Sequence, residues 1–108
     1  DNDRLSAEVA DLVAANRLLL LTSSDGLMDA EGRRIPVAKK VSDVLQYVRP
    51  DKGEMSVGGM RTKLQAVEYA LSRRIPVAIL DGRKPGQIAA AVAEKDAGTR
   101  FPLPRRSR

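Results

Sequence analysis

The sequence contains no cysteine, no histidine and no tryptophan among its 108 residues. Without cysteine and histidine there can be no disulfide, no thiol nucleophile, no imidazole base and no zinc site of the usual kind. Any catalysis must therefore use carboxylates, lysines, hydroxyl groups and backbone dipoles. Only one Phe and two Tyr are present, so we expect a core of aliphatic side chains and little stacking on nucleic-acid bases.

Long apolar runs are also missing. No stretch approaches the roughly 18 apolar residues of a membrane span, and no signal peptide is visible, so we expect no membrane partner and a reducing, cytoplasmic setting. The chain begins with Asp-Asn-Asp rather than Met and passes directly into a helical pattern. We therefore expect the N-terminal part of a longer protein to lie outside these residues.

The formal net charge of +5 is concentrated near the C-terminus. Four of the 19 basic residues follow residue 99, so residues 1–99 carry 15 basic side chains against 14 acidic ones. Residues 102–108 are typical of a basic linker or frayed tail. A contact of this tail with a phosphate backbone is the alternative, and nucleic acid is the least favoured of the partners considered.

The rest of the chain alternates helical and strand patterns. Helices are expected over residues 4–16, 60–74 and 85–95, and buried strands over 17–22, 76–80 and 99–103. The connections are a long loop or small hairpin at 23–36, a short element at 41–48 that could be either helix or strand, and a mobile link at 50–59. This order is typical of an α/β protein with a parallel sheet layered between helices. Its ligands would bind outside the carboxyl ends of the strands, from Thr22 and from Asp81 onward.

Two of the expected helices carry an apolar face at helical spacing. In the first, this face consists of Leu5, Val9, Leu12 and Val13, with Asn2 or Asp3 as the N-cap and Asn16 at the end. In the second, it consists of Met60, Leu64, Val67 and Leu71. The third helix begins at Pro85, whose missing N–H costs nothing at a first helical position.

The start of the second helix has the properties of a phosphate-binding site. Gly58 and Gly59 let the backbone approach a ligand closely, and the free N–H groups of a first helical turn favour an anion. Lys63 adds a mobile positive charge. The spacing differs from that of a P-loop, so a flexible helix entry with a surface lysine is the alternative.

Three further segments combine polar groups, and each has a plain structural alternative. The acidic and amide groups of residues 1–3 could receive a polar substrate or simply cap a helix. Residues 22–26, Thr-Ser-Ser-Asp-Gly, could line a site or only lead out of a strand. Residues 81–86, Asp-Gly-Arg-Lys-Pro-Gly, are most simply a turn before a helix, with both basic side chains in solvent.

Taken together, these segments resemble the C-terminal half of the amino acid kinase family, and within it most closely the glutamate 5-kinases. The likeness is carried by residues 1–7, Asp-Asn-Asp-Arg-Leu-Ser-Ala, and by the Leu-Leu-Leu-Leu-Thr strand and the loop that follows it, residues 18–28. It continues through residues 57–66, Val-Gly-Gly-Met-Arg-Thr-Lys-Leu-Gln-Ala, residues 82–85 and the closing Gly-Thr-Arg-Phe of 98–101. The match runs nearly from end to end.

The resemblance implies a fold, a domain and a reaction. The fold would be a three-layer αβα sandwich with a mainly parallel sheet, and residues 1–101 would be its ATP-binding half. An absent N-terminal half of the same fold would hold most of the acceptor site. The implied reaction transfers the γ-phosphoryl group of ATP, with Mg²⁺, to the γ-carboxylate of L-glutamate, the first step of proline biosynthesis. A homo-oligomer is the implied assembly.

The resemblance also implies roles for individual residues. Lys63 would contact the transferred phosphoryl group, Asp3 would orient the catalytic lysines, and Asn2 and Asp1 would face the acceptor amino acid. The implied ATP-binding residues are Thr22, Ser23, Val57, Gly58, Gly59, Met60, Arg61, Thr62 and Lys63. No protein side chain is implied as a metal ligand.

The chain departs from the family pattern at several positions. Ser23 stands where the family usually has Asp, Met28 replaces a loop Tyr, and Ser56 and Val57 replace Gly-Thr before the paired glycines. Two alternatives therefore stand beside the glutamate kinase. One is a family member with another acceptor, such as acetylglutamate, aspartate, a nucleoside monophosphate or a phosphonate. The other is a nucleotide-binding regulatory module without catalysis.

Overall fold

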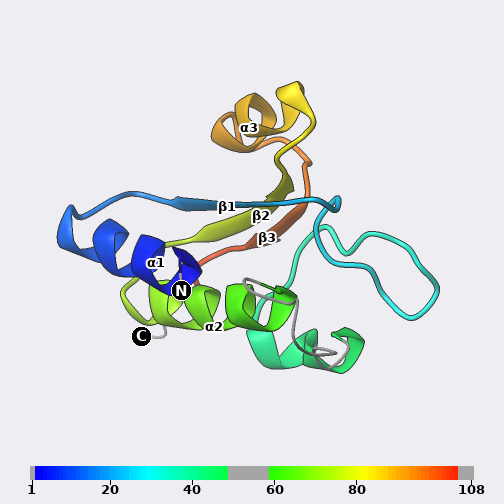
Figure 1. Cartoon of the computed structure of the whole chain (residues 1–108), viewed down its shortest axis with the longest axis horizontal. Coiled ribbons are helices and arrows are strands. Elements are labelled where there is room, and N and C mark those ends of the chain that lie inside the picture. The colour runs from blue at the N-terminus through cyan, green and yellow to red at the C-terminus, as the bar shows by residue number, and fades with distance from the viewer. Residues whose placement is uncertain (1, 49–58, 105–108) are drawn as a thin grey trace.

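A three-stranded sheet forms the centre of the chain in the computed structural model, which describes residues 2–48 and 59–104 (Figure 1). The strands are β1 (Leu18–Thr22), β2 (Val77–Asp81) and β3 (Thr99–Phe101), in the order β1-β2-β3. β1 and β2 are parallel along their whole length, from the pair Leu18 and Val77 to the pair Thr22 and Asp81. The predicted α/β class is therefore confirmed, and the sheet is mostly parallel.

The direction of β3 differs from the parallel arrangement expected from the sequence, because β3 runs antiparallel to β2. The helix between them, α3 (Pro85–Val92), has only eight residues and extends about 12 Å. It lies over the carboxyl end of β2 in Figure 1. The chain therefore re-enters the sheet from that same end, and a strand entering there must run antiparallel.

Helices cover both faces of the sheet. α1 (Asn2–Leu12) and α2 (Met60–Ser72) lie side by side under one face, and α3 lies on the other (Figure 1). The larger apolar cluster joins α1 and α2 to β2 and Phe101, and the smaller one joins α3 to Ala78 and Leu80. The complete three-layer sandwich stays a prediction, because the described residues form only three strands.

The apolar face of α2 is the one expected from the sequence. Leu64 and Val67 are fully buried against the sheet, and Met60 and Leu71 are partly buried at the two ends of the stripe. The helix ends at Ser72, two residues earlier than predicted, and Arg74 takes a left-handed conformation with φ 63°. The chain can then turn sharply into β2.

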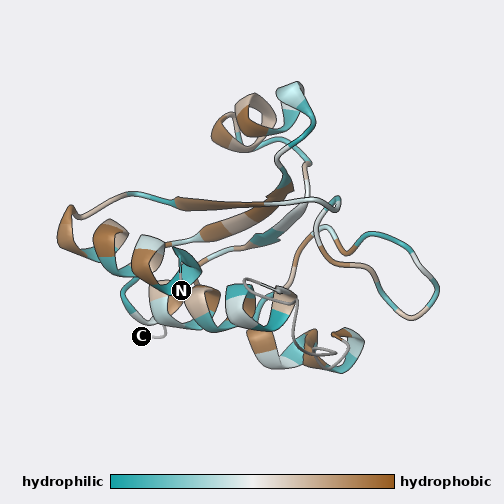
Figure 2. Ribbon diagram, in the orientation of Figure 1, coloured by the Kyte–Doolittle hydropathy of each residue, from teal (hydrophilic) through white to brown (hydrophobic). Residues whose placement is uncertain are grey.

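The apolar face of α1, in contrast, lies on the outside. Leu5, Val9 and Leu12 are exposed, whereas Ala7 and Ala10 are buried. Figure 2 shows the resulting hydrophobic colour along α1. The bounds also differ from the prediction: the helix begins at Asn2, so that Asp3 lies in its first turn rather than at the N-cap, and it ends at Leu12 rather than near Asn16.

β1 and β2 differ in burial, although both were expected to be buried on both faces. All five residues of β2 are buried, because it has a strand on each side and helices on both faces. In β1 only Leu20 is buried, and Leu21 is exposed. The reason is that β1 is an edge strand of the sheet that the described residues form.

The connections follow the sequence closely. An isolated antiparallel bridge joins Met28 to Arg34, so the loop contains a small hairpin, and a parallel bridge joins Val37 to Arg100 beside β3. The short element at 41–48 consists of two 3₁₀ turns, η1 (Val41–Asp43) and η2 (Leu45–Tyr47). The expected mobile link lies almost wholly outside the described residues. No helix within residues 2–48 and 59–104 is both long and apolar enough to cross a membrane.

Candidate functional site

The starts of α1 and α2 bring two of the predicted catalytic residues together. Lys63 lies in the first turn of α2 and Asp3 in the first turn of α1, and the Lys63 ammonium nitrogen is 3.4 Å from Asp3 Oδ2. Only 10% of the Lys63 side chain and 15% of the Asp3 side chain are exposed. The two helix starts therefore hold a largely desolvated ion pair.

A seam of small residues explains why these two side chains meet. Asp3, Ala7 and Ala10 follow one another on the same face of α1, one turn apart, and both alanines are buried. The facing side of α2 carries Ala66 and Ala70, also buried, above Lys63. Because alanine side chains are short, the helix backbones can approach closely, and the charged residues at the head of the seam then lie within reach.

The first turn of α2 adds a hydroxyl group to this pair. Gly59 is the N-cap residue in an extended conformation, and its carbonyl accepts hydrogen bonds from the Lys63 backbone N–H at 3.2 Å and the Thr62 hydroxyl at 2.8 Å. The Thr62 hydroxyl is also 3.4 Å from Asp3 Oδ2. The remaining N–H groups of a first helical turn point away from the helix body, which suits an anion.

A second group of polar residues lies where β1 and β2 end. Thr22 pairs with Asp81 at the last position of the parallel ladder, and the Thr22 carbonyl accepts a 2.9 Å hydrogen bond from the Gly82 N–H. Ser23 follows directly and is exposed. This is the edge of a parallel sheet at which ligands of α/β proteins bind, and the predicted nucleotide-lining residues of β1 lie there.

Asp81 is held by the turn that follows it. The Arg83 side chain donates two hydrogen bonds of 3.1 Å, one to each carboxylate oxygen of Asp81, and the Arg83 backbone N–H adds one of 2.9 Å. The Arg83 side chain, and then its backbone N–H, lower the pKa of Asp81. The Arg83 and Lys84 side chains are both largely exposed, as the sequence predicts, but Arg83 is also paired with Asp81.

A glutamine that the sequence analysis did not single out connects the ends of both strands. Gln87 Oε1 accepts a 2.9 Å hydrogen bond from the Asp81 N–H, and Gln87 Nε2 donates one of 2.7 Å to Asp25 Oδ1. The other oxygen of Asp25 lies 3.9 Å from both Arg34 Nε and Lys84 Nζ. No spacing rule predicts this contact, because 62 residues separate Gln87 from Asp25.

The predicted site residues thus fall into four sets. Asp3, Thr62 and Lys63 form one cluster with the backbone of Gly59, and Thr22 and Ser23 lie at the end of β1. Asn2 is exposed, and its backbone carbonyl accepts a hydrogen bond from the Ser6 hydroxyl. Arg61 is exposed, and Met60 is partly buried. The remaining predicted residues, Asp1, Val57 and Gly58, lie outside the described part of the chain.

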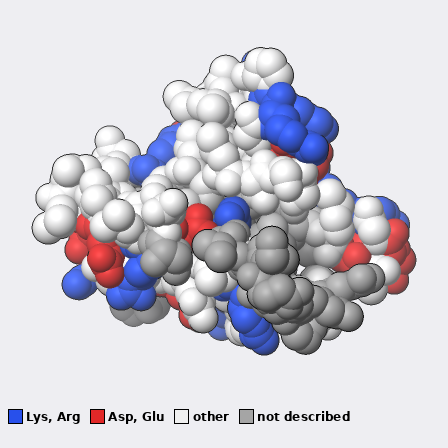
Figure 3. Space-filling model, viewed as in Figure 1, with Lys and Arg blue, Asp and Glu red and all other residues white. Residues whose placement is uncertain are grey.

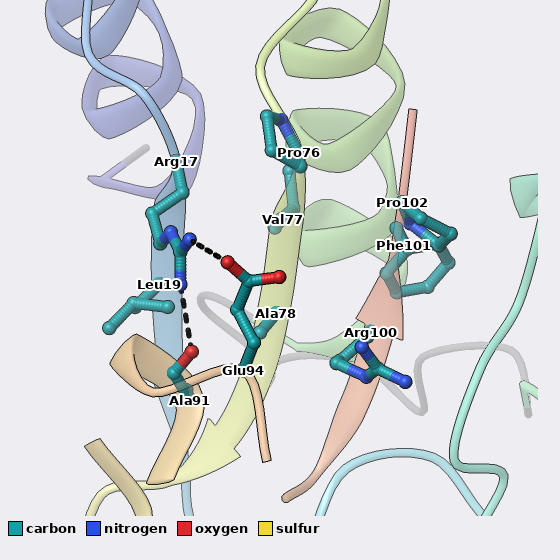
Figure 4. A pocket seen from close by; sticks show the side chains of 10 residues that line it. All are labelled: Arg17, Leu19, Pro76, Val77, Ala78, Ala91, Glu94, Arg100, Phe101 and Pro102. Atoms are coloured by element: carbon teal, nitrogen blue, oxygen red, sulfur yellow. Dashed lines mark hydrogen bonds and ion pairs between the residues drawn. The ribbon is translucent and has the colours of Figure 1, made fainter. Parts of the chain in front are cut away.

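A cavity of about 120 Å³ lies elsewhere, on the α3 side of the sheet near the start of β2 (Figure 4). Arg17 reaches across it, donating hydrogen bonds to the Ala91 carbonyl at 2.8 Å and to Glu94 at 3.3 Å. Arg100 Nε is buried there without a hydrogen-bond partner. None of the predicted site residues lines this cavity, and its volume is below the roughly 300–1,000 Å³ of typical small-molecule pockets.

Comparison with known proteins places these features in context. Residues 1–81 match the amino acid kinase family. Glutamate 5-kinases of Serratia marcescens and Citrobacter koseri are 42% and 43% identical to the chain over 94% of its length. The chain spans only 29% of the length of either relative.

Solved structures show the same fold at lower identity. N-acetylglutamate synthase from Neisseria gonorrhoeae, complexed with coenzyme A and N-acetyl-glutamate, superimposes with a TM-score of 0.77 at 21% identity. That match covers 98% of this chain and 24% of the synthase. UMP kinase from Ureaplasma parvum gives a TM-score of 0.67 at 14% identity, over 94% of this chain and 40% of that enzyme.

Proposed function

Because this chain belongs to the amino acid kinase family, we propose that it is the ATP-binding half of a glutamate 5-kinase-like enzyme. The intact enzyme would transfer the γ-phosphoryl group of MgATP to the γ-carboxylate of L-glutamate. The observation that carries the proposal is the buried contact between Lys63 and Asp3 at the starts of two helices. The identity of about 42% to glutamate 5-kinases supports the choice of acceptor.

Phosphoryl transfer suits a site of this composition. The reaction depends on positioning and on electrostatic stabilisation of charge that develops on the transferred group, so it needs neither histidine nor cysteine. In the proposal, the Lys63 ammonium contacts the β- and γ-phosphates, and Asp3 holds that ammonium in place. The acceptor carboxylate is already ionised at neutral pH, so no general base is required.

The nucleotide is proposed to bind between the start of α2 and the carboxyl end of β1. Gly59 and the first-turn N–H groups of α2 would receive the phosphates, and Thr22 and Ser23 would line the pocket. Mg²⁺ would be held mainly by the phosphates, as is common for this ion. Within the described residues, no three acidic side chains lie close enough together to hold a metal ion.

The acceptor site requires more polypeptide than these residues provide. Asn2 and Asp1 are proposed to face the amino acid from the start of α1, and the N-terminal half of the fold would enclose it. The homo-oligomer and the cytoplasmic setting stay predictions.

The decisive experiment measures ADP release by the full natural polypeptide that contains residues 1–108. L-glutamate, acetylglutamate, aspartate and UMP are each supplied with MgATP. We expect turnover with glutamate at least 100-fold above that with the other acceptors. Preference for another acceptor would assign the chain to a different member of the family, and nucleotide binding without any turnover would favour a regulatory module.

A further inference from the structure

The Gln87 side chain joins the ends of the two parallel strands. Its Oε1 accepts a 2.9 Å hydrogen bond from the N–H of Asp81, the last residue of β2. Its Nε2 donates a 2.7 Å hydrogen bond to Asp25 Oδ1, shortly after the end of β1. Gln87 lies in the first turn of α3 and is half-buried. Because an amide offers an acceptor and a donor at once, one side chain can satisfy a backbone N–H and a carboxylate together.

The Asp25 carboxylate is held from its other side by two cations. Its Oδ2 lies 3.9 Å from both Arg34 Nε and Lys84 Nζ, and 32% of its side chain is exposed. Figure 3 shows basic side chains gathered beside the start of α3, with acidic atoms directly below them. Hydrogen bonds to an ionised carboxylate are stronger than those between neutral groups. Gln87 therefore fastens Asp25 to α3 through a charge-assisted hydrogen bond.

The loop after β1 is anchored to two different elements. Its farther part is held by β3, because the fully buried Thr99 hydroxyl accepts a 2.8 Å hydrogen bond from the Leu27 N–H and donates one of 2.6 Å to the Ile35 carbonyl. Both arms of the small hairpin are thus tied to β3. The nearer part, residues 23–25, is tied to α3 instead, through the hydrogen bond from Gln87.

We propose that Gln87 is a positioning residue for the nucleotide, which acts by holding Asp25 against α3. Ser23 then lies between two fixed points, since Thr22 before it is paired in the sheet and its carbonyl accepts a 2.9 Å hydrogen bond from the Gly82 N–H. The inference rests on the proposed function, which puts Thr22 and Ser23 in the wall of the nucleotide pocket. It goes further by giving a role to a residue outside the set that the family resemblance implies.

The role of Gln87 concerns nucleotide binding rather than the transfer step. The Lys63–Asp3 pair lies at the starts of α2 and α1, on the opposite face of the sheet from α3 (Figure 1). The hydrogen bonds of the Gln87 side chain involve neither of these helices. A change at Gln87 should therefore leave the pair in place. A displaced pocket wall weakens the ground state and the transition state alike, which raises KM and leaves kcat unchanged.

Steady-state kinetics of the full natural polypeptide test the proposal, with MgATP and L-glutamate varied separately. Gln87→Glu sets a carboxylate against Asp25 and removes the donor. The double variant Asp25→Asn with Gln87→Glu restores the hydrogen bond in the reverse direction, because the amide at position 25 then donates to the carboxylate at position 87. Gln46→Glu is the matched control, since Gln46 is exposed and donates to the Asp43 carbonyl at 3.2 Å.

We expect Gln87→Glu to raise KM for MgATP at least about fivefold, the size expected for the loss of one net hydrogen bond. Its kcat and its KM for glutamate should stay close to the parent values. The double variant should recover the parent KM for MgATP, and Gln46→Glu should keep it. An unchanged KM for MgATP in Gln87→Glu would overturn the proposal. A parallel loss of kcat, or a double variant without recovery, would also overturn it, because either result indicates general damage to the fold.

Calorimetric titration with MgATP separates this inference from the proposed function. If the parent phosphorylates glutamate and Gln87→Glu keeps the parent KM for MgATP, the positioning role is wrong and the proposed function stands. If the parent binds MgATP but phosphorylates no acceptor, the proposed function fails. The dissociation constants of the same variants then decide the role of Gln87 by the same criteria. A parent that does not bind MgATP overturns both.

A second variant covers the case in which Gln87→Glu does not fold. Gln87→Ala removes both hydrogen bonds of the side chain without adding a charge. We expect it to raise KM for MgATP by at least the same factor, again with the parent kcat. Parent values of both constants in Gln87→Ala would overturn the proposal.

Discussion

Lys63 and Asp3 are 60 residues apart in the sequence, yet the Lys63 ammonium nitrogen lies 3.4 Å from Asp3 Oδ2. The contact joins the first turns of two helices and depends on the small residues that let these helices approach. An ammonium group near the start of a helix opposes the helix dipole. The neighbouring Asp3 carboxylate therefore stabilises the Lys63 ammonium at the start of α2, where a phosphate could also bind.

Replacing Lys63 with Ala should nearly abolish catalysis in the full enzyme. Loss of one preorganised hydrogen-bond donor typically raises the activation free energy by about 3 kcal/mol or more, which corresponds to at least about a 100-fold loss of kcat. The loss of kcat is measured by steady-state ADP release. Lys95→Ala, at an exposed position after α3, is the matched control and should retain the parent rate.

The Lys63–Asp3 pair should also contribute to folding. A double-mutant cycle with Asp3→Ala and Lys63→Ala should give a coupling of about 1–3 kcal/mol in the free energy of unfolding, because the two side chains are largely buried. The exposed Arg4–Glu8 pair on α1 is the comparison and should give only about 0.3–0.5 kcal/mol. Equal couplings for the two pairs would show that burial of Lys63 and Asp3 is not maintained in solution.

Gln87→Glu should destabilise the protein by about 1–3 kcal/mol at pH 7, because it replaces a donor to Asp25 with a second carboxylate. Chemical denaturation at pH 7 measures this loss. Gln65→Glu, at an exposed position on α2, is the matched control and should change stability little.

Asp81 should make stability depend on pH on the acidic side. Its folded pKa is lowered by Arg83, so the unfolded state binds the proton more readily. This contribution is fully present above the unfolded pKa, about 3.9, and is lost as the pH falls through the folded pKa. Asp81→Asn should therefore be less stable than the parent at pH 7. Between pH 5 and pH 2 its free energy of unfolding should fall by less than that of the parent. Denaturation curves over that range, with Asp43→Asn as the exposed control, decide the point.

Gly98 should not tolerate a side chain. Its φ of 58° lies in the left-handed region, and a Cβ there would collide with the backbone oxygen of Ile79. Gly98→Ala should therefore cost more than about 1 kcal/mol of unfolding free energy. Gly86→Ala is the control, since a Cβ would meet nothing within 4 Å there, and the change should be neutral or stabilising. A neutral Gly98→Ala would show that the turn into β3 can rearrange.

The order of elements and the main residues of the candidate site could be predicted from local patterns. Apolar spacing identified α2 with its buried Leu64 and Val67, and the strand patterns over 17–22 and 76–80 identified β1 and β2. The glycine and the lysine at the start of α2 indicated a possible anion site. These features are local, because they depend on helix and strand periodicity and on the chemistry of a few adjacent residues.

Other features were decided only when distant segments packed. The sequence by itself determined that α1 has an apolar face, but the tertiary structure decided that the alanine face is buried and the leucine face open, because periodicity does not say what covers a helix. The direction of β3 was decided by the short α3, which stays at one end of the sheet. The link between Asp25 and Gln87 arises only because two strand ends lie side by side, and no local pattern carries information on such long-range contacts.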